Sequence, residues 1–361
     1  YTNLNTLSLH DALPILLALL DIAPDQVSHE IEQLYYRLQQ PLELAGSDIA
    51  VQLSCGVSLA PQDAHSGEEL LRHAEFALEA ARSGNSSSIE YYASEQNAAA
   101  RERHQLAAAL PVALGRGELE VHFQPFVDIV SGDIVGAEAL VRWRHPEKGW
   151  ISPAEFIPLA EETGQIHALG RFVLEESVRC QIDWIGRAGR EIAMAVNASS
   201  LQLRDPEFIP FIEQLLQRYQ LSPRLLEIEV TESLSIELFE QAPEAIGRLH
   251  ALGVCLSIDD FGTGYSSLSY LRRLPASKLK IDRSFIERVP AEHQDADLAH
   301  MIISLGKILN MTIVAEGVET VEQLQFLSEH GCDIGQGFLF SRPVCAADFW
   351  LLLERGIKFR D

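Results

Sequence analysis

Carboxylates and one amide recur where short apolar runs end in the second two thirds of the chain. Asn197 ends AMAVN, Glu229 lies in LEIEV, Asp259 and Asp260 end CLSIDD, and Glu316 follows TIVA. Two bare carboxylates about 4 Å apart repel each other by about 4 kcal/mol at an effective dielectric constant of 20. Such a group is stable only when it is protonated or neutralised, and an all-oxygen set suits Mg²⁺ or Mn²⁺ better than Zn²⁺. We therefore expect a divalent cation site.

The adjacent pair Asp259–Asp260 adds a second feature, because one carboxylate can bridge two ions while its neighbour reaches only one. Two ions about 3.5–4 Å apart form the clamp that is used for in-line phosphoryl displacement. In AEALVR, Glu138, Leu140 and Arg142 share one face of a strand. Arg142 offers a planar fork for a phosphate oxygen, or alternatively an ion pair with an acid of the rim.

Lys280 and Asp282 in KLKID alternate with Leu279 and Ile281, which assigns them to the interior face of a strand. Lys280 has two interpretations: a buried structural cation paired with the acids, or a group that orients or deprotonates an attacking water. Burial lowers the pKa of a lysine and neighbouring carboxylates raise it, so a base and a positioning residue both stay open.

A glycine-rich loop, 261–267 (FGTGYSS), directly follows the Asp pair, and its glycines permit unusual backbone angles and mobility. Glu232 is a candidate to hold this loop by hydrogen bonds; its alternative role is that of an acidic residue at a helix N-terminus.

These residues need a scaffold that gathers strand ends at one rim. Strand patterns alternate with helical ones from about residue 118 onward. The eight predicted strands are Leu119–Gln124, Ile134–Arg142, Ile192–Asn197, Leu226–Val230, Val254–Ile258, Lys278–Ile281, Thr312–Ala315 and Ile334–Leu339. The main predicted helices are Pro153–Glu162, Leu169–Gly186, Pro206–Tyr219, Leu238–Leu252, Ala296–Leu309 and Val321–Glu329. This order predicts an α/β protein with a TIM-type (β/α)₈ barrel, whose site lies at the carboxyl ends of the strands. An open doubly wound sheet is the less favoured alternative, because no G-x-G-x-x-G follows a strand.

Composition limits the partners. The chain has 361 residues and a net charge of −24, which disfavours nucleic-acid polymers and anionic lipid. Its five cysteines form no C-x-x-C motif and suit a reducing compartment. The apolar run Ile15–Leu20 is too short to span a bilayer. We expect a cytoplasmic protein without membrane contact in this stretch, although a longer parent could be anchored upstream.

The N-terminal third has a different organisation. Residues 1–15 show no clear period and look foreign to the fold, and the chain begins with Tyr1 rather than Met, which suggests a piece of a longer protein. Residues 16–92 predict a small α+β part, with helices over Asp25–Gln40 and Glu68–Ala81 and strands over Ile49–Leu59 and Ile89–Tyr92. A linking helix over 93–114, a barrel over 115–356 and a tail over 357–361 complete the predicted domains.

Residues 115–356 resemble the EAL domain of cyclic-di-GMP phosphodiesterases. The motifs that carry the resemblance, in family order, are Glu138–Arg142, Asn197, Glu229–Glu232, Asp259–Gly264, Lys280–Asp282, Glu316–Glu319 and Gln336–Phe338. The resemblance implies a variant TIM barrel, a homodimer through the barrel, and hydrolysis of cyclic-di-GMP to linear pGpG with two Mg²⁺ or Mn²⁺ ions.

The resemblance also implies a role for each matched residue. The implied metal ligands are Glu138, Asn197, Glu229, Asp259, Asp260 and Glu316. The implied catalytic residues are Lys280, Glu138 and Glu319. Gln124, Arg142, Asp282 and Gln336 are implied to bind substrate, and Glu232 to stabilise the loop.

Residues 16–92 resemble the C-terminal part of a GGDEF diguanylate cyclase domain, through VQLSCGVSLAP at 51–61, AEFAL at 74–78 and Tyr91–Tyr92. The G-G-[DE]-E-F loop itself is absent, so we expect no synthesis of cyclic-di-GMP by this stretch. Two other functions are weighed against the phosphodiesterase: a non-catalytic receptor for the dinucleotide, and a different metal-dependent barrel enzyme of an enolase-like kind.

Overall fold

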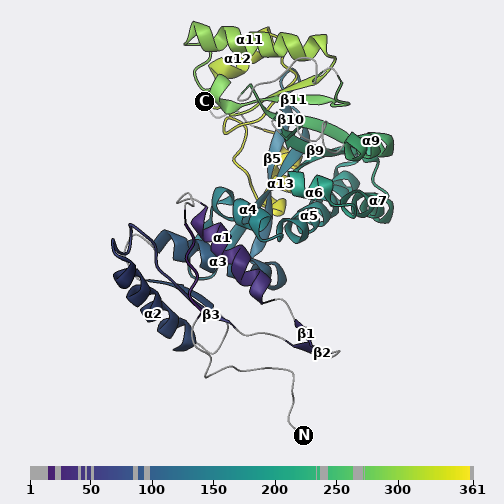
Figure 1. The fold of residues 1–361 in the computed structure, drawn as a ribbon. Coiled ribbons are helices and arrows are strands. Elements are labelled where there is room, and N and C mark those ends of the chain that lie inside the picture. The colour runs from purple at the N-terminus through teal and green to yellow at the C-terminus, as the bar shows by residue number, and fades with distance from the viewer. Residues whose placement is uncertain are drawn as a thin grey trace. The chain divides into compact units, whose positions relative to one another are not determined.

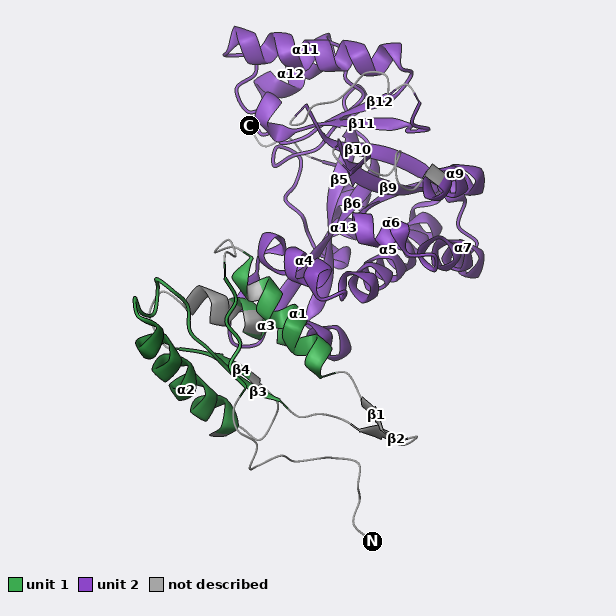
Figure 2. Cartoon of the chain, viewed as in Figure 1, with its two compact units in different colours: residues 1–109 green, residues 110–361 purple. Residues whose placement is uncertain are grey.

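The computed structural model describes residues 15–20, 26–39, 42–44, 47–49, 53–83, 88–92, 98–232, 234–235, 243–262, 271 and 273–357. The chain divides into two compact units, Tyr1–Ala109 and Leu110–Asp361, which are shown in green and purple in Figure 2. The predicted foreign stretch 1–15, except Ile15, and the predicted tail, except Ile357, lie outside the described residues.

The first unit is a small α/β assembly. Its helices are α1 (Val27–Leu38), α2 (Gly67–Ser83) and most of α3 (Ala98–Arg116), which continues into the second unit. Its strands are β1 (Leu42–Leu44), β2 (Ser47–Ile49), β3 (Ser54–Val57) and β4 (Ser88–Tyr91).

β3 and β4 pair in parallel, and a small core of Tyr35, Val57, Ile89 and Tyr91 joins them to α1. Within the strand expected over Ile49–Leu59, Ile49 belongs to β2 and Ser54–Val57 form β3, while residues 50–52 lie outside the described chain.

The second unit is a closed eight-stranded barrel (Figure 1). Its strands are β5 (Leu119–Asp128), β6 (Ile134–His145), β8 (Ala193–Asn197), β9 (Leu226–Thr231), β10 (Cys255–Phe261), β11 (Lys278–Ile281), β12 (Thr312–Ala315) and β13 (Ile334–Gly335). The sheet runs β5-β13-β12-β11-β10-β9-β8-β6, and pairing between β5 and β6 closes it. A short strand β7 (Gly149–Ile151) pairs with β6 outside the ring. The predicted barrel class and its eight strand regions are confirmed.

Two details depart from a regular (β/α)₈ barrel. β5 runs antiparallel to both of its neighbours, β6 and β13, because it forms a hairpin with β6 instead of crossing over through a helix. β13 ends at Gly335, four residues before the predicted end at Leu339. Here the chain leaves the sheet to pack on Val318: a Cβ at Gly337 would lie 2.1 Å from the Val318 carbonyl oxygen, and Leu339 N–H donates to that carbonyl.

Helices cover the outside of the barrel. They are α4 (Pro153–Glu162), α5 (Ile166–Ala188), α6 (Ser200–Arg204), α7 (Phe208–Tyr219), α9 (Pro243–Leu252), α11 (His293–Ile308), α12 (Val321–Glu329) and α13 (Ala346–Arg355), with 3₁₀ turns η2 (Pro223–Leu225) and η3 (Arg283–Phe285). Local sequence explains their ends: Ser152 caps α4 by accepting from Ala154 N–H, and Gly189, at φ +65°, ends α5. No helix in the described part of the chain is long and apolar enough to cross a membrane.

Strand alternation separates an apolar outer face from a mixed interior. Ile228 and Leu279 belong to the large core beneath the helices. Inside the barrel, a small apolar cluster contains Phe126, Ala195, Val314 and Ile334. The inward positions of β9 and β11 are charged, at Glu227 and Glu229 and at Lys278 and Lys280, and this pattern places ionic groups where most barrels place aliphatic ones.

Candidate active site

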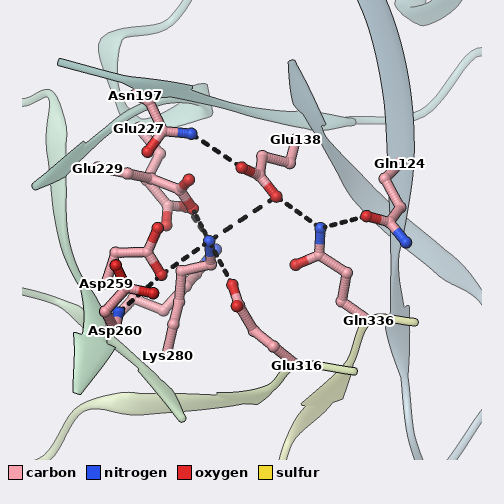
Figure 3. A network of polar contacts seen from close by, with 11 residues as sticks. Gln124, Glu138, Asn197, Glu227, Glu229, Asp259, Asp260, Lys280, Glu316 and Gln336 are labelled. Atoms are coloured by element: carbon pink, nitrogen blue, oxygen red, sulfur yellow. Dashed lines mark hydrogen bonds and ion pairs between the residues drawn. The ribbon is translucent and has the colours of Figure 1, made fainter. Parts of the chain in front are cut away.

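A buried lysine ammonium lies among four carboxylates at the carboxyl ends of the parallel strands (Figure 3). Lys280 Nζ is 2.6 Å from Glu316 Oε1, 3.1 Å from Glu229 Oε1, 3.1 Å from Asp259 Oδ1 and 3.8 Å from Glu138 Oε2. The side chains come from β6, β9, β10, β11 and the end of β12. The structure therefore brings together the acids that sequence pattern assigned to one rim.

Amides hold Glu138 in place from both sides. Its Oε1 accepts from Asn197 Nδ2 at 2.8 Å, and its Oε2 accepts from Gln336 Nε2 at 2.6 Å. Gln336 Nε2 also donates to Gln124 Oε1 at 3.1 Å, and Gln124 Nε2 donates to the Ser341 carbonyl. Three predicted site residues thus fix the orientation of a fourth.

Asp259 and Asp260 would point to opposite faces of a regular strand, because side chains alternate. Asp260 instead adopts φ +53°, and the register between β10 and β11 shifts between Ile258 and Phe261. An aspartate tolerates this left-handed conformation better than most residues, and the irregularity turns both carboxylates to one side. Oxygens of Asp259, Asp260 and Glu316 consequently lie within 4.8 Å of one another.

The charges in this cluster are unbalanced, since one ammonium faces four acids. Burial raises the pKa of Glu229 well above its ordinary value, and it raises that of Glu316 to about 8, although Lys280 opposes both shifts. Burial also raises the pKa of Asp260, with Asp259 adding to the shift. For Lys280 burial lowers the pKa, but the surrounding carboxylates outweigh it, so the net pKa lies well above the ordinary value.

Unpaired polar atoms in this cluster fit divalent cations. Oε2 of the fully buried Glu229 has no hydrogen-bond partner within the described chain, and its Oε1 lies 3.1 Å from Lys280 Nζ. Buried polar atoms normally have partners, and a cluster of carboxylate and amide oxygens is the donor set that Mg²⁺ and Mn²⁺ prefer. The residues present therefore fit the metal site that the sequence predicts.

Other predicted residues lie at the edge of the cluster. Glu232 Oε2 accepts from Gly262 N–H at 2.8 Å, which ties the start of the glycine-rich loop to the end of β9; residues 263–270 lie outside the described chain. Asp282 caps η3 by accepting from Ser284 N–H at 3.1 Å, and Glu319 forms an ion pair with Arg283. Asp282 is therefore already engaged as a cap, a role that strand parity did not predict.

The site opens into a hollow of about 240 Å³, into which Glu138, Asp259 and Glu316 project. Arg142 does not line it. It lines a neighbouring hollow of about 370 Å³ together with His122 and Trp150. β6 pairs with β8 only as far as Ala139, so Arg142 extends beyond the barrel rim, and the expected single pocket is two adjacent ones.

Sequence reasoning missed Arg283 and Phe338, which also line the smaller hollow. Phe338 belongs to the Gln336–Phe338 motif and Arg283 directly follows the Lys280–Asp282 motif, so position next to a motif was the available signal.

The chain is similar in sequence to a known protein family and to characterised relatives. Residues 107–343 match the family model described as the EAL domain. The bifunctional diguanylate cyclase/cyclic di-GMP phosphodiesterase MucR of Pseudomonas aeruginosa is 41% identical over 315 residues, which are 87% of this chain and 46% of MucR. The cyclic di-GMP phosphodiesterase NbdA of the same organism is 40% identical over 328 residues, covering 90% of this chain and 42% of NbdA. The chain thus spans less than half the length of these two relatives.

A solved structure titled as the PaMucR phosphodiesterase in complex with c-di-GMP is similar to the barrel. Its TM-score is 0.65 at 45% identity, and the match covers 68% of this chain and 99% of that one.

Proposed function

Because the chain belongs to the EAL domain family, we propose that its barrel hydrolyses cyclic-di-GMP to linear pGpG. In this reaction a water oxygen bonds to phosphorus, the bond from phosphorus to the 3′ oxygen breaks, and that oxygen takes up a proton. The observation that carries the proposal is the buried group of four carboxylates around Lys280 at the mouth of the barrel.

Two Mg²⁺ or Mn²⁺ ions fit the available ligands. Asp259, Asp260 and Glu316, whose oxygens lie within 4.8 Å of one another, would hold one ion, and we assign Glu138, Asn197, Glu229 and Asp259 to the other. When bound, such ions neutralise phosphate charge and favour ionisation of a water. They would also offset the repulsion between the acidic rim and an anionic dinucleotide.

The chain's own residues position the reactants. The charged neighbours of Lys280 Nζ are all carboxylates, so its protons point toward acceptors, and an attacking water would be oriented by the same donor. We assign Lys280 to water positioning, with Glu138 and Glu319 as further catalytic residues. Gln336 and Gln124 keep Glu138 in one orientation, and they contact substrate together with Arg142 and Asp282.

A cyclic dinucleotide is larger than either hollow, and the two hollows adjoin along the β5–β6 ribbon. His122, which lines the larger one, is the register partner of Leu140, which lines the smaller one. A ligand of two nucleotides would extend from the carboxylates toward Arg142, whose guanidinium can bind a phosphate.

We further propose that residues 16–92 are the C-terminal part of a GGDEF-like domain and that 93–114 link it to the barrel. The similarity to MucR supports this, since its 315 aligned residues exceed the span matched by the EAL model. The missing signature loop makes cyclase activity of this stretch unexpected.

We also propose a homodimer through the barrel and a cytoplasmic setting. Met301 and Ile308 are 58% and 76% exposed, and their spacing places them on one face of α11, which a second copy could cover. All five cysteines are unpaired, as in a reducing compartment. Light scattering of the parent and Met301→Asp tests the dimer, which should dissociate in the variant.

Chromatographic assay of cyclic-di-GMP with Mg²⁺, with and without excess EDTA, tests the proposed function. We expect pGpG only when metal is present, and we expect Glu138→Ala to lose hydrolysis while keeping its circular dichroism spectrum. Exposed Glu155→Ala on α4 is the matched control. Full turnover in EDTA contradicts metal dependence, and binding of the dinucleotide without any product identifies a receptor instead.

A further inference from the structure

Arg283 projects into the mouth of the acidic hollow, although no sequence pattern marked it. Among the described residues that line this hollow, it is the one cationic side chain. It is the first residue of η3 and follows β11 after Asp282. Its Nη2 lies 3.1 Å from Glu319 Oε1 and 3.9 Å from Glu287 Oε1.

The backbone opposite makes room for this side chain. Gly317 has φ +69°, and a Cβ placed there would lie 2.4 Å from Arg283 Cγ and 2.8 Å from Arg283 Cβ. The arginine stem therefore lies across the backbone of Gly317, the residue that follows Glu316. A side chain at position 317 would be strained by its φ angle and would displace the arginine.

A buried glutamine fastens the two segments that carry this pair. Gln323 Nε2 donates to the carbonyls of Ile286 and Glu287, at 3.0 and 3.2 Å, and Gln323 Oε1 accepts from Glu319 N–H at 2.7 Å. The backbone segments that carry Arg283 and Glu319 are thus held together before any ligand arrives, and such pre-organisation lowers the entropic cost of binding.

The ion pair with Glu319 is weak enough to be exchanged. The Arg283 and Glu319 side chains are 50% and 40% exposed, and exposed pairs contribute only about 0–1 kcal/mol. A phosphate diester offers two non-bridging oxygens that match the guanidinium fork.

We propose that Arg283 is a substrate-binding residue, which exchanges Glu319 for a phosphate oxygen of the cyclic dinucleotide. This inference rests on the proposed function and adds to it a cationic contact in the hollow that Arg142 does not line. It also explains the glycine at position 317, because the absence of a side chain there lets the arginine stem reach the rim.

Steady-state kinetics and isothermal titration of cyclic-di-GMP test the inference with Arg283→Gln, Arg283→Lys and the control Arg288→Gln. Arg288 lies three residues after the end of η3 and is, like Arg283, an exposed arginine paired with a glutamate, but it does not line the hollow. We expect Arg283→Gln to raise KM with Mg²⁺, and to weaken Kd in EDTA, by about tenfold to a hundredfold, since it removes a charge-assisted contact. The KM and Kd of Arg283→Lys should lie between those of the parent and those of Arg283→Gln. Arg288→Gln should have the KM and Kd of the parent.

The salt dependence of Kd gives a readout that a structural role would not change. Loss of a phosphate contact should make the plot of log Kd against log salt concentration shallower in Arg283→Gln than in the parent. Parent-like KM and Kd in Arg283→Gln, or a fall in kcat alone, overturn the inference while leaving the proposed function intact. Absence of product from the parent enzyme overturns the proposed function itself.

Discussion

Two lysines lie two residues apart on β11, both point into the barrel, and their surroundings differ. Lys278 has one carboxylate partner, Glu227, and also lies 4.8 Å from the centre of the Phe126 ring. Lys280 has four carboxylates around it, at 2.6 to 3.8 Å from its Nζ. The first pair is balanced in charge, as a structural ion pair should be. The second leaves an excess of negative charge that folding alone does not require, and such an excess marks a binding site.

The largest expected effect separates the two lysines by activity. Lys280→Met should lower kcat for cyclic-di-GMP by about 10²–10³-fold, because the hydrogen-bond donor that orients the attacking water is lost. The kcat of the parent, measured in the same assay at saturating Mg²⁺, is the reference for this decrease. A kcat above a tenth of the parent value would show that Lys280 is only structural.

Lys278→Met should instead lower the free energy of unfolding by about 3–5 kcal/mol, since it leaves Glu227 buried without its cation. Replacing both partners, as Lys278→Met with Glu227→Leu, should restore most of that loss. Urea denaturation measures both variants, and the folded fraction should keep the parent kcat. If Lys278→Met alone is as stable as the parent, the Lys278–Glu227 ion pair contributes nothing to the free energy of unfolding.

The two glutamates of β9 offer a matched comparison for metal affinity. Glu229→Gln removes a proposed ligand and should weaken the apparent affinity for Mg²⁺ by at least about tenfold, as even outer-shell changes do. Glu227→Gln lies two residues before it along the same strand and should leave this affinity unchanged. Calorimetric titration with Mg²⁺ measures the affinity of both variants. An equal loss of Mg²⁺ affinity in both would refute the proposal that Glu229 is a metal ligand and Glu227 is not.

The last comparison concerns pH. In the metal-free chain the pKa of Glu316 is about 8, against 4.5 ordinarily, so the folded state holds a proton that the unfolded state has released between these values. Stability of the metal-free protein should therefore fall as pH rises from about 5 to 8. Saturating Mg²⁺ should reduce this dependence, as should Glu316→Gln. Thermal melts across that range provide the measurement, and a metal-free stability that increases with pH would contradict it.

Sequence pattern predicted the barrel well because alternation and strand length are local properties. Glu229 and Lys280 point inward as parity required, and all eight strand regions are present. Pattern does not encode strand direction, so the antiparallel β5 could not be predicted from it. Parity also failed at Asp260, whose positive φ depends on tertiary contacts.

Arg142 and Arg283 show the same limit for the candidate site. Arg142 shares a strand face with Glu138, but the strand continues past the rim, so the two line different hollows. Arg283 reaches the site through Gly317 and Gln323, which are distant along the chain. A contact of this kind becomes visible only once the loops are placed in space.

The reversed direction of β5 has a consequence for whatever precedes the barrel. Leu119 pairs with Trp143, five residues beyond Glu138 on β6, so the first strand begins at the end of the barrel that carries the carboxylates. Had β5 been parallel, the upstream chain would be tethered at the opposite end. The end of α3 at Arg116 is therefore joined, through the two residues that precede β5, to the end of the barrel that carries the carboxylates.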